Sequence, residues 1–322
     1  MTIPAKIHFC WIGDHLPWAY VFAILSAADQ SELPEIILHH TDFLEDDAGL
    51  QALKHKPGVY LSRLEPLAYL GHVGEMIGVG DDLSDLYRKL ERPVMRSDVL
   101  RAAILYVEGG IYLDLDTVTV TSLLPLLNET AFVGSEFLVW PQQHGRARSP
   151  FLLVRQLILN ALRKICRKLP RGWVLFKRIE RFYFQSVNNA IMGSELQSTF
   201  ISDYIQSMLH LPHERQLARY ALGPHLLQEV AARHSGSDLT IYEPTIFYPL
   251  APEISEHWFR ISSMMKLGKV LSRQTRVVHW YASVRTNQRI TQITPDYIRK
   301  HRKRQMYSAL VHAAIKNLPI LT

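Results

Sequence analysis

The sequence has few cysteines and no long apolar run. Cys10 and Cys166 are the only two thiols among the 322 residues. Both stand in apolar or basic surroundings without metal-ligand spacing, so we expect buried, unreactive side chains. No apolar run approaches the roughly 18 residues of a membrane-spanning helix. The first residues, MTIPAKIHFCWIG, lack a signal-peptide layout, so we expect a cytoplasmic protein.

Acidic residues are nearly missing from one part of the chain. The formal net charge is +6. Between Gln142 and Phe184, eleven Lys and Arg residues stand against one acid, Glu180, and residues 297–305 (YIRKHRKRQ) add a second basic block. The positive charge is therefore local, which indicates a surface for an anionic partner. Because no recognised nucleic-acid-binding motif accompanies the charge, we expect no nucleic acid partner.

Hydrophobic patterns in the first half alternate between strand and helix. The strand-like segments are 6–12, 34–40, 59–64, 111–116 and 130–136, and the helical ones are 18–32 and 92–110, the latter ended by Gly109 and Gly110. Strands that alternate with helices form mostly parallel sheets covered on both faces. The sequence therefore predicts an α/β fold with an open, mostly parallel sheet.

Two aspartates interrupt the apolar strand IYLDLD at 111–116. On a strand, Asp114 and Asp116 face the same side with Cα atoms about 7 Å apart. Ionised carboxylates repel each other and are costly to bury, so replacing either by Asn is expected to stabilise the metal-free protein slightly. A divalent cation that also binds phosphate oxygens relieves this repulsion, and Mg²⁺ or Mn²⁺ suits such oxygen ligands. The alternative is a solvated strand end with two exposed aspartates.

The helix before this strand carries an isolated pair of opposite charges. Asp98 and Arg101 are three residues apart and share one face of an otherwise apolar helix. They form either a structural ion pair or part of a binding site.

These residues together form a recognisable motif. It is S-D-x-x-R…G-G-x-Y-x-D-x-D, with Ser97, Asp98, Arg101, Gly109, Gly110, Tyr112, Asp114 and Asp116. It resembles the signature of the DXD-motif glycosyltransferases with a sugar-binding region, the family-32 type, and of the glucosyltransferase domains of large clostridial toxins. Residues 3–13, IPAKIHFCWIG, are similar to the family's opening strand. The resemblance covers roughly residues 3–136.

The resemblance implies a GT-A-like fold and a metal-dependent transfer of a hexose, with retention of configuration. The donor would be a UDP- or GDP-hexose, the cofactor Mn²⁺ (or Mg²⁺), and the acceptor a hydroxyl of a glycan, lipid or protein. The implied donor-binding residues are Trp11, which would stack on the base, Asp98 and Arg101 on the sugar, Tyr112 on the nucleotide, and Asp114, which with Asp116 would hold the metal on the diphosphate. Trp11 and Tyr112 also suit plain packing roles.

The resemblance is weaker in the second half. SVNNAIMGSE resembles an acceptor-side strand and implicates Asn188 or Asn189; we take Asn189 as a catalytic candidate beside Asp98 and Arg101, although Asn pairs are also common in loops. LGPHLLQEVAARH would place Gly223 and Pro224 in a loop near the donor. RVVHWYAS offers His279 as a third metal ligand, but the family's final Trp after Ser283 is missing, so a core histidine is equally consistent.

A basic segment separates the two halves. On a helix from Phe151 to Lys168 one side collects the polar residues Gln156, Asn160, Arg163, Lys164, Arg167 and Lys168, and the other is mostly apolar. This pattern predicts a helix lying on an anionic bilayer, with an ordinary surface helix as the alternative. We expect one glycosyltransferase domain over 1–322, with a nucleotide-sugar-binding half (1–136), the basic insertion (140–184), an acceptor-side half (185–294) and a basic C-terminal helix (295–322).

The sequence therefore predicts a hexosyltransferase. Cell-surface polysaccharide or glycolipid synthesis is one role that fits, with the protein in the cytoplasm or peripheral on the inner face of the membrane. A catalytically inactive sugar-nucleotide-binding or acceptor-binding protein of the same fold is the main alternative. A metal-dependent phosphoesterase fits less well, because one DxD supplies too few carboxylates for a two-metal site.

Overall fold

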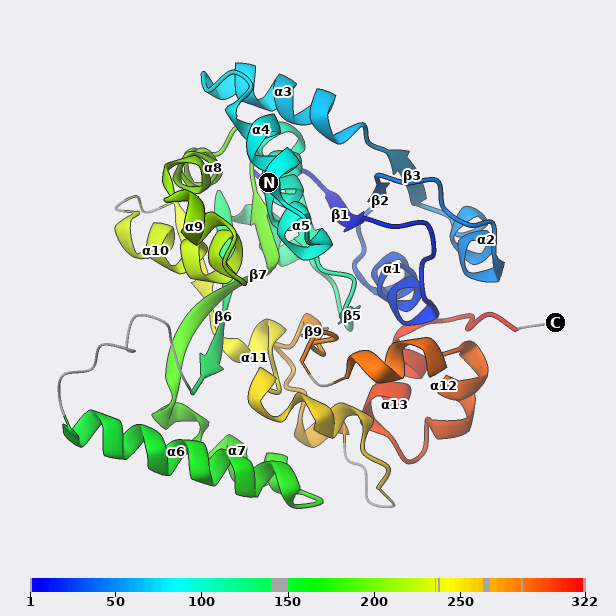
Figure 1. Cartoon of the computed structure of the whole chain (residues 1–322). Coiled ribbons are helices and arrows are strands. Elements are labelled where there is room, and N and C mark those ends of the chain that lie inside the picture. Colours follow the sequence, from blue (N-terminus) through cyan, green and yellow to red (C-terminus); the bar gives the residue numbers. More distant parts are fainter. Residues whose placement is uncertain are drawn as a thin grey trace.

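A seven-stranded sheet organises the chain. The computed structural model describes residues 2–139, 150–234, 236, 238–262, 267–284 and 286–320. The strand order is β3-β2-β1-β4-β7-β6-β8 (Figure 1). These strands are β1 (Lys6–Trp11), β2 (Glu35–His40), β3 (Val59–Arg63), β4 (Gly110–Leu113), β6 (Ala131–Leu138), β7 (Phe184–Ser194) and β8 (Leu239–Tyr242). Strand β7 runs antiparallel to both β4 and β6, and the other pairs are parallel. The predicted open, mostly parallel α/β sheet is confirmed.

Helices cover both faces of this sheet. The longer ones are α1 (Trp18–Gln30), α3 (Pro66–Ile77), α5 (Pro93–Glu108), α6 (Pro150–Lys168), α8 (Thr199–His210) and α13 (Met306–Ala314). The shorter ones are α2 (Ala48–Lys54), α4 (Asp82–Lys89), α7 (Gly172–Ile179), α9 (His213–Gln216), α10 (Leu226–Arg233), α11 (Pro244–Phe247) and α12 (Pro295–His301). One apolar core lies under α1 and α13, and a second lies under α5 and α8.

The C-terminal part differs from the prediction. The expected single helix over 295–322 is two helices, α12 and α13, separated by a turn at residues 302–304. Helix α12 carries the basic residues, whereas α13 is apolar and packs against α1 in the core. The basic block is therefore confined to α12 and the turn after it.

The aspartates follow a strand that ends early. Strand β4 stops at Leu113, so the predicted strand over 111–116 is wrong in its last three residues. The chain then turns and enters β5 (Thr117–Thr119), which pairs with β9 (Val277–His279) in a second, two-stranded sheet. Asp114 and Asp116 therefore lie beyond the carboxyl end of a central strand, where open α/β sheets bind their ligands. The register places Thr117 opposite His279.

Two buried histidines hold the other end of β4. Nδ1 of His8 lies 2.9 Å from Nε2 of His39, and Nε2 of His8 lies 2.9 Å from the carbonyl oxygen of Gly109. Burial lowers the pKa of His8 well below its usual value, with His39 and Lys6 adding to the effect. Burial likewise lowers the pKa of His39 to about 4. Both imidazoles are therefore neutral in the folded protein at pH 7.

We expect this pair to make the protein sensitive to acid. A histidine with a depressed pKa favours the folded state above its unfolded pKa of 6.5, and this stability is lost as the pH falls toward about 4. For His39 alone the loss reaches about 3 kcal/mol. Urea unfolding at several pH values should therefore show a weaker pH dependence between 6.5 and 4 in His39→Gln than in the wild type. Equal slopes in the variant and the wild type would contradict the prediction. His55→Gln, which replaces an exposed histidine, is the matched control.

Candidate active site

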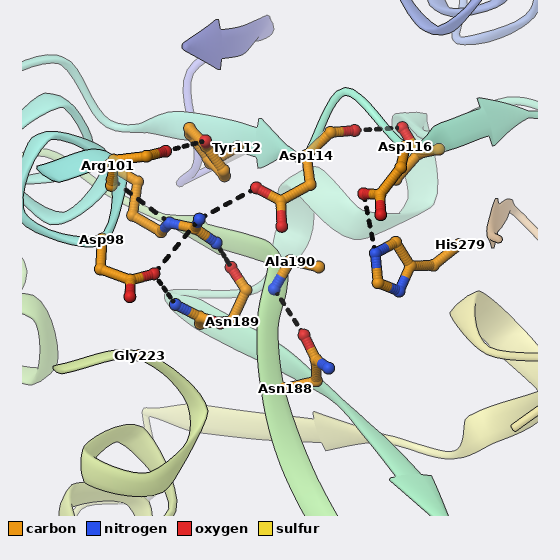
Figure 2. A network of polar contacts seen from close by, with 12 residues as sticks. Asp98, Arg101, Tyr112, Asp114, Asp116, Asn188, Asn189, Ala190, Gly223 and His279 are labelled. Atoms are coloured by element: carbon orange, nitrogen blue, oxygen red, sulfur yellow. Dashed lines mark hydrogen bonds and ion pairs between the residues drawn. The ribbon is translucent and has the colours of Figure 1, made fainter. Parts of the chain in front are cut away.

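Three side chains with metal-ligand chemistry converge just after β4 and at the end of β9 (Figure 2). One ligand atom from each of Asp114, Asp116 and His279 lies within 4.8 Å of the others. Oδ1 of Asp116 lies 2.8 Å from Nε2 of His279, and its Oδ2 accepts a 2.7 Å hydrogen bond from the N–H of Ala282. His279 therefore lies beside Asp116, although 163 residues separate the two in the sequence, and its role as a third metal ligand stays a prediction.

Electrostatics make this group suitable for a cation. Burial raises the pKa of Asp114, and the charge of Asp116 adds to this. Burial also opposes ionisation of Asp116, but His279 and the Ala282 N–H hold its pKa below the usual value. Among the described residues, the buried Nδ1 of His279 has no hydrogen-bond partner. Two carboxylates and the imidazole nitrogen that faces Asp116 form a donor set that fits Mn²⁺ or Mg²⁺.

Arg101 is the centre of a buried polar network. Its side chain contacts Asp98 at 3.3 Å and Asp114 at 3.0 Å, and it donates to the backbone carbonyl of Asn189 at 2.5 Å. The Asn189 amide donates to Oδ1 of Asp98 at 2.8 Å. Burial raises the pKa of Asp98 to about 6 in spite of Arg101. Asp98 and Arg101 therefore form a structural ion pair and also belong to the site, because Arg101 links Asp98 to Asp114.

The two predicted aromatic contacts differ in their positions. Trp11 borders a cleft next to Arg101 and packs against Tyr20, with ring centroids 5.2 Å apart. Tyr112 is only 1% exposed, and the Arg101 guanidinium lies 4.7 Å from its ring centroid. Tyr112 is not among the residues that border either cleft of the site. The packing alternative therefore describes Tyr112 better than a nucleotide contact, and its ring supports Arg101.

Two clefts meet at this network. The first, of about 300 Å³, is lined by Trp11, Tyr20 and Ser97, and the second, of about 380 Å³, by Asn188 and Asn189. Both clefts are also lined by the residues Val94, Arg101, Asp114, Asp116 and Ser283. A molecule in either cleft therefore reaches the aspartates and Arg101.

The second cleft has two polar residues that the sequence analysis missed, Glu136 and Tyr281. Glu136 is buried and accepts a 2.7 Å hydrogen bond from the Asn188 amide and a 2.6 Å bond from the Tyr281 hydroxyl. Burial raises its pKa above the usual value. In the sequence, Glu136 stands at the end of the predicted strand 130–136. Nothing in that pattern distinguishes it from a solvent-exposed glutamate. Asn188 thus binds Glu136, whereas Asn189 binds Asp98.

Gly223, in the LGP segment, packs closely against Asp98. A Cβ atom on Gly223 would lie 2.8 Å from Oδ2 of Asp98 and 3.0 Å from Nδ2 of Asn189. Pro224 borders the second cleft. The segment is a short kinked helix, η4 (Ala221–His225), rather than the predicted loop, and Gly223 lies against the network at a position where only a hydrogen atom fits.

We expect Gly223→Ala to disturb this network. The added methyl group must displace Asp98 or η4, and overpacking of this kind costs about 1–3 kcal/mol. The free energy of unfolding should fall by that amount, and binding of any ligand that uses Asp98 should weaken. Gly71→Ala is a matched control, since its Cβ would meet only ordinary contacts, the nearest at 3.6 Å. Equal stability of Gly223→Ala and the wild type would contradict the close packing.

Comparisons with known proteins agree with the motif. Residues 74–133 match the family model described as "Glycosyltransferase sugar-binding region containing DXD motif". No curated protein matched the chain by sequence. The matched segment contains Asp98, Arg101, Tyr112 and both aspartates.

Several solved glycosyltransferases are similar in structure. The PaToxG glycosyltransferase is 14% identical with a TM-score of 0.45, over 72% of this chain and 69% of that chain. The UDP-bound glycosyltransferase domain of the YGT toxin is 10% identical with a TM-score of 0.41, over 74% and 79%. The galactosyltransferase LgtC, in complex with donor and acceptor sugar analogues, is 11% identical with a TM-score of 0.43, over 98% and 97%. The family match confirms the resemblance that the sequence showed: residues 74–133 match a glycosyltransferase sugar-binding region that contains the DXD motif, which supports glycosyltransferase activity.

Proposed function

We propose that the protein is a metal-dependent hexosyltransferase that uses a UDP- or GDP-hexose and an acceptor hydroxyl. The observation that carries the proposal is the group of Asp114, Asp116 and His279, whose ligand atoms lie within 4.8 Å at the junction of two clefts. One cleft suits the donor and the other the acceptor, because both reach this group.

Each cleft has its own recognition chemistry. In the first, Trp11 offers an indole face to the nucleotide base, and Arg101 lies between Asp98 and Asp114, where a sugar diphosphate would meet the aspartates. In the second, Asn189 is held by Asp98 and borders the space for the acceptor. Asp98, Arg101 and Asn189 thus orient the donor sugar toward the acceptor cleft.

The reaction needs charge stabilisation on the leaving diphosphate. Mn²⁺ or Mg²⁺ held by Asp114, Asp116 and His279 would supply Lewis-acid stabilisation of that charge. The Ala282 N–H and the His279 ring fix the orientation of Asp116, and Arg101 fixes Asp114. We propose retention of the anomeric configuration, as the resemblance implies.

The finer biological role follows from the basic segment. We place the protein in the cytoplasm and on the inner face of the membrane, with a role in cell-surface polysaccharide or glycolipid synthesis. The supporting observation is the exposed positive charge between residues 150 and 184, which includes Lys164, Lys168, Arg171, Arg178 and Arg181. The acceptor would then be a glycan or a lipid-linked glycan, rather than a protein.

Release of the nucleoside diphosphate tests the activity. The purified protein is incubated with UDP- and GDP-hexoses and Mn²⁺, with candidate acceptors, and with or without EDTA. Metal-dependent release that rises with an acceptor supports transfer. Binding of the sugar nucleotide without release would favour the inactive binding protein. Hydrolysis of simple phosphoesters without sugar transfer would favour the phosphoesterase.

A further inference from the structure

The helices α6 and α7 present an apolar surface to solvent. On α6 the exposed apolar residues are Phe151, Leu153, Val154, Leu157, Ile158 and Ile165, and they are between 50% and 76% exposed. Leu169, Leu175 and Phe182 extend this surface over the following turn, α7 and the segment before β7. Among the described helices, none is long and apolar enough to cross a membrane. We call these nine residues the outer apolar face.

Part of the polar side of α6, including Gln156, Arg163 and Arg167, points toward the body of the protein, whereas Lys164 and Lys168 are exposed. Arg163 forms a 2.5 Å ion pair with Glu253, and Nε of Arg167 lies 2.8 Å from Glu256. Both acids belong to the 3-10 helix η5 (Pro252–Phe259). Arg260, directly after η5, donates to the Leu169 carbonyl at 2.6 Å at the end of α6. The expectation that Arg163 and Arg167 face a bilayer is therefore wrong, because they anchor the helix to η5.

This orientation departs from the usual arrangement of a surface helix, because α6 buries Leu159 and Cys166 but leaves six other apolar side chains exposed. An ordinary surface helix buries its apolar stripe and exposes its polar face. Here Gln156 is buried, whereas Ile158 is 55% exposed. Figure 1 shows α6 and α7 at the periphery, beyond the ends of the long strands β6 and β7. Exposed apolar side chains do not stabilise a monomer in water. The outer apolar face therefore indicates a partner that covers it.

Exposed positive charge lies on the same elements as the outer apolar face. Lys164, Lys168, Arg171, Arg178 and Arg181 are exposed on the same helices and turns. A bilayer with anionic headgroups offers both an apolar interior and negative charge, and each basic residue near it contributes about 1 kcal/mol. A second copy of the chain would bring two surfaces of the same positive charge together in a twofold contact. The charge therefore favours the bilayer.

We infer that the outer apolar face inserts into the headgroup region of an anionic bilayer, with the lysines and arginines at its rim on the lipid phosphates. This goes beyond a purely electrostatic contact, because the apolar residues of α6, and not Arg163 or Arg167, enter the membrane. Arg163 instead connects the inserted helix to Glu253, which borders the second cleft. The docked helix thus fixes that cleft relative to the lipid surface. If the proposed function holds, the second cleft receives an acceptor carried by a lipid.

Co-sedimentation with vesicles tests the inference without any sugar donor. The full chain is mixed with vesicles of phosphatidylcholine alone and of phosphatidylcholine with phosphatidylglycerol. We expect sedimentation with the anionic vesicles. The triple variant Phe151→Ser, Val154→Ser, Ile158→Ser should lower the partition coefficient by at least about tenfold, because three inserted apolar side chains are lost. Lys164→Gln with Lys168→Gln should weaken binding to the anionic vesicles only.

A matched variant controls for apolar surface in general. Leu196, Leu217 and Ile241 are exposed to a similar degree away from α6 and α7, and their replacement by Ser should leave partitioning unchanged. Three results would overturn the inference: no sedimentation with anionic vesicles, equal loss in both triple variants, or a dimer in solution that the α6 substitutions dissociate. Vesicle binding without sugar transfer would leave the inference standing and refute the proposed function instead.

Discussion

Asp116→Asn is expected to reduce sugar transfer by about 10²–10³-fold or more, with the protein still folded. Asp116 lies 2.8 Å from His279, and together with Asp114 it borders both clefts. The neutral amide of Asn cannot replace a carboxylate on a divalent cation. Asp114→Asn should have a comparable effect on transfer.

The two substitutions differ in their effect on stability. Asp116 accepts from Ala282 and contacts His279, and its pKa is lowered, so its charge favours the folded state. Asp116→Asn should therefore cost about 1–3 kcal/mol, contrary to the small gain expected from the sequence. Asp114 has a raised pKa, which means that burial disfavours its charge. The gain from Asp114→Asn is offset by the contact that Arg101 loses.

Mn²⁺ titration provides the measurement. The wild type should gain thermal stability with Mn²⁺, and both variants should lose this gain together with transfer. Asp46→Asn is the control for loss of a surface charge, because Asp46 is an exposed aspartate paired with Lys54. Wild-type turnover in folded Asp116→Asn would refute the metal site.

The local motif was predictable because each of its parts has a local signal. The helix ending at Gly109 and Gly110, the strand after it and the two aspartates lie within one stretch of sequence, so periodicity and turn residues reveal them. His279 could be suggested only by resemblance, because its approach to Asp116 depends on the pairing of β5 with β9. The end of β4 at Leu113 likewise depends on which partner strands remain available.

The orientation of α6 could not be predicted from its own sequence. Periodicity separates the polar side from the apolar side, but it does not tell which side faces the protein. Glu253 and Glu256 decide this, and they lie about 90 residues further along the chain. The same limit applies to Glu136, whose partners Asn188 and Tyr281 come from β7 and from the segment after β9.

Arg101→Ala is expected to lower both the stability and the activity strongly. Arg101 is 3% exposed and neutralises Asp98 and Asp114. Its removal leaves Asp98 as a buried carboxylate without a cation, and breaking a buried ion pair in this way costs about 3–5 kcal/mol. Because Arg101 contacts Asp98, Asp114 and the Asn189 carbonyl as well as the Tyr112 ring, its removal should disturb the whole network.

The pH dependence identifies the cause of this loss. Burial already raises the pKa of Asp98 to about 6 in the wild type, and removal of Arg101 should raise it further. An acid with a raised folded-state pKa destabilises the protein above that pKa, and the penalty disappears as the pH falls through it toward the unfolded value of 3.8. The stability deficit of Arg101→Ala relative to the wild type should therefore shrink between pH 7 and pH 4.

A double-mutant cycle separates the structural role of Arg101 from its role toward the donor. If the stranded carboxylate causes the instability, Asp98→Asn should restore part of the stability of Arg101→Ala, with a coupling of about 0.5–3 kcal/mol. Arg101→Lys keeps the charge but cannot reach Asp98, Asp114 and the Asn189 carbonyl together, so it should retain more stability than Arg101→Ala while transfer stays low. Affinity for UDP or GDP alone should change little in folded Arg101→Lys. If that affinity fell as much as transfer did, Arg101 would not act on the sugar, and its contribution would be confined to holding Asp98 and Asp114 in place.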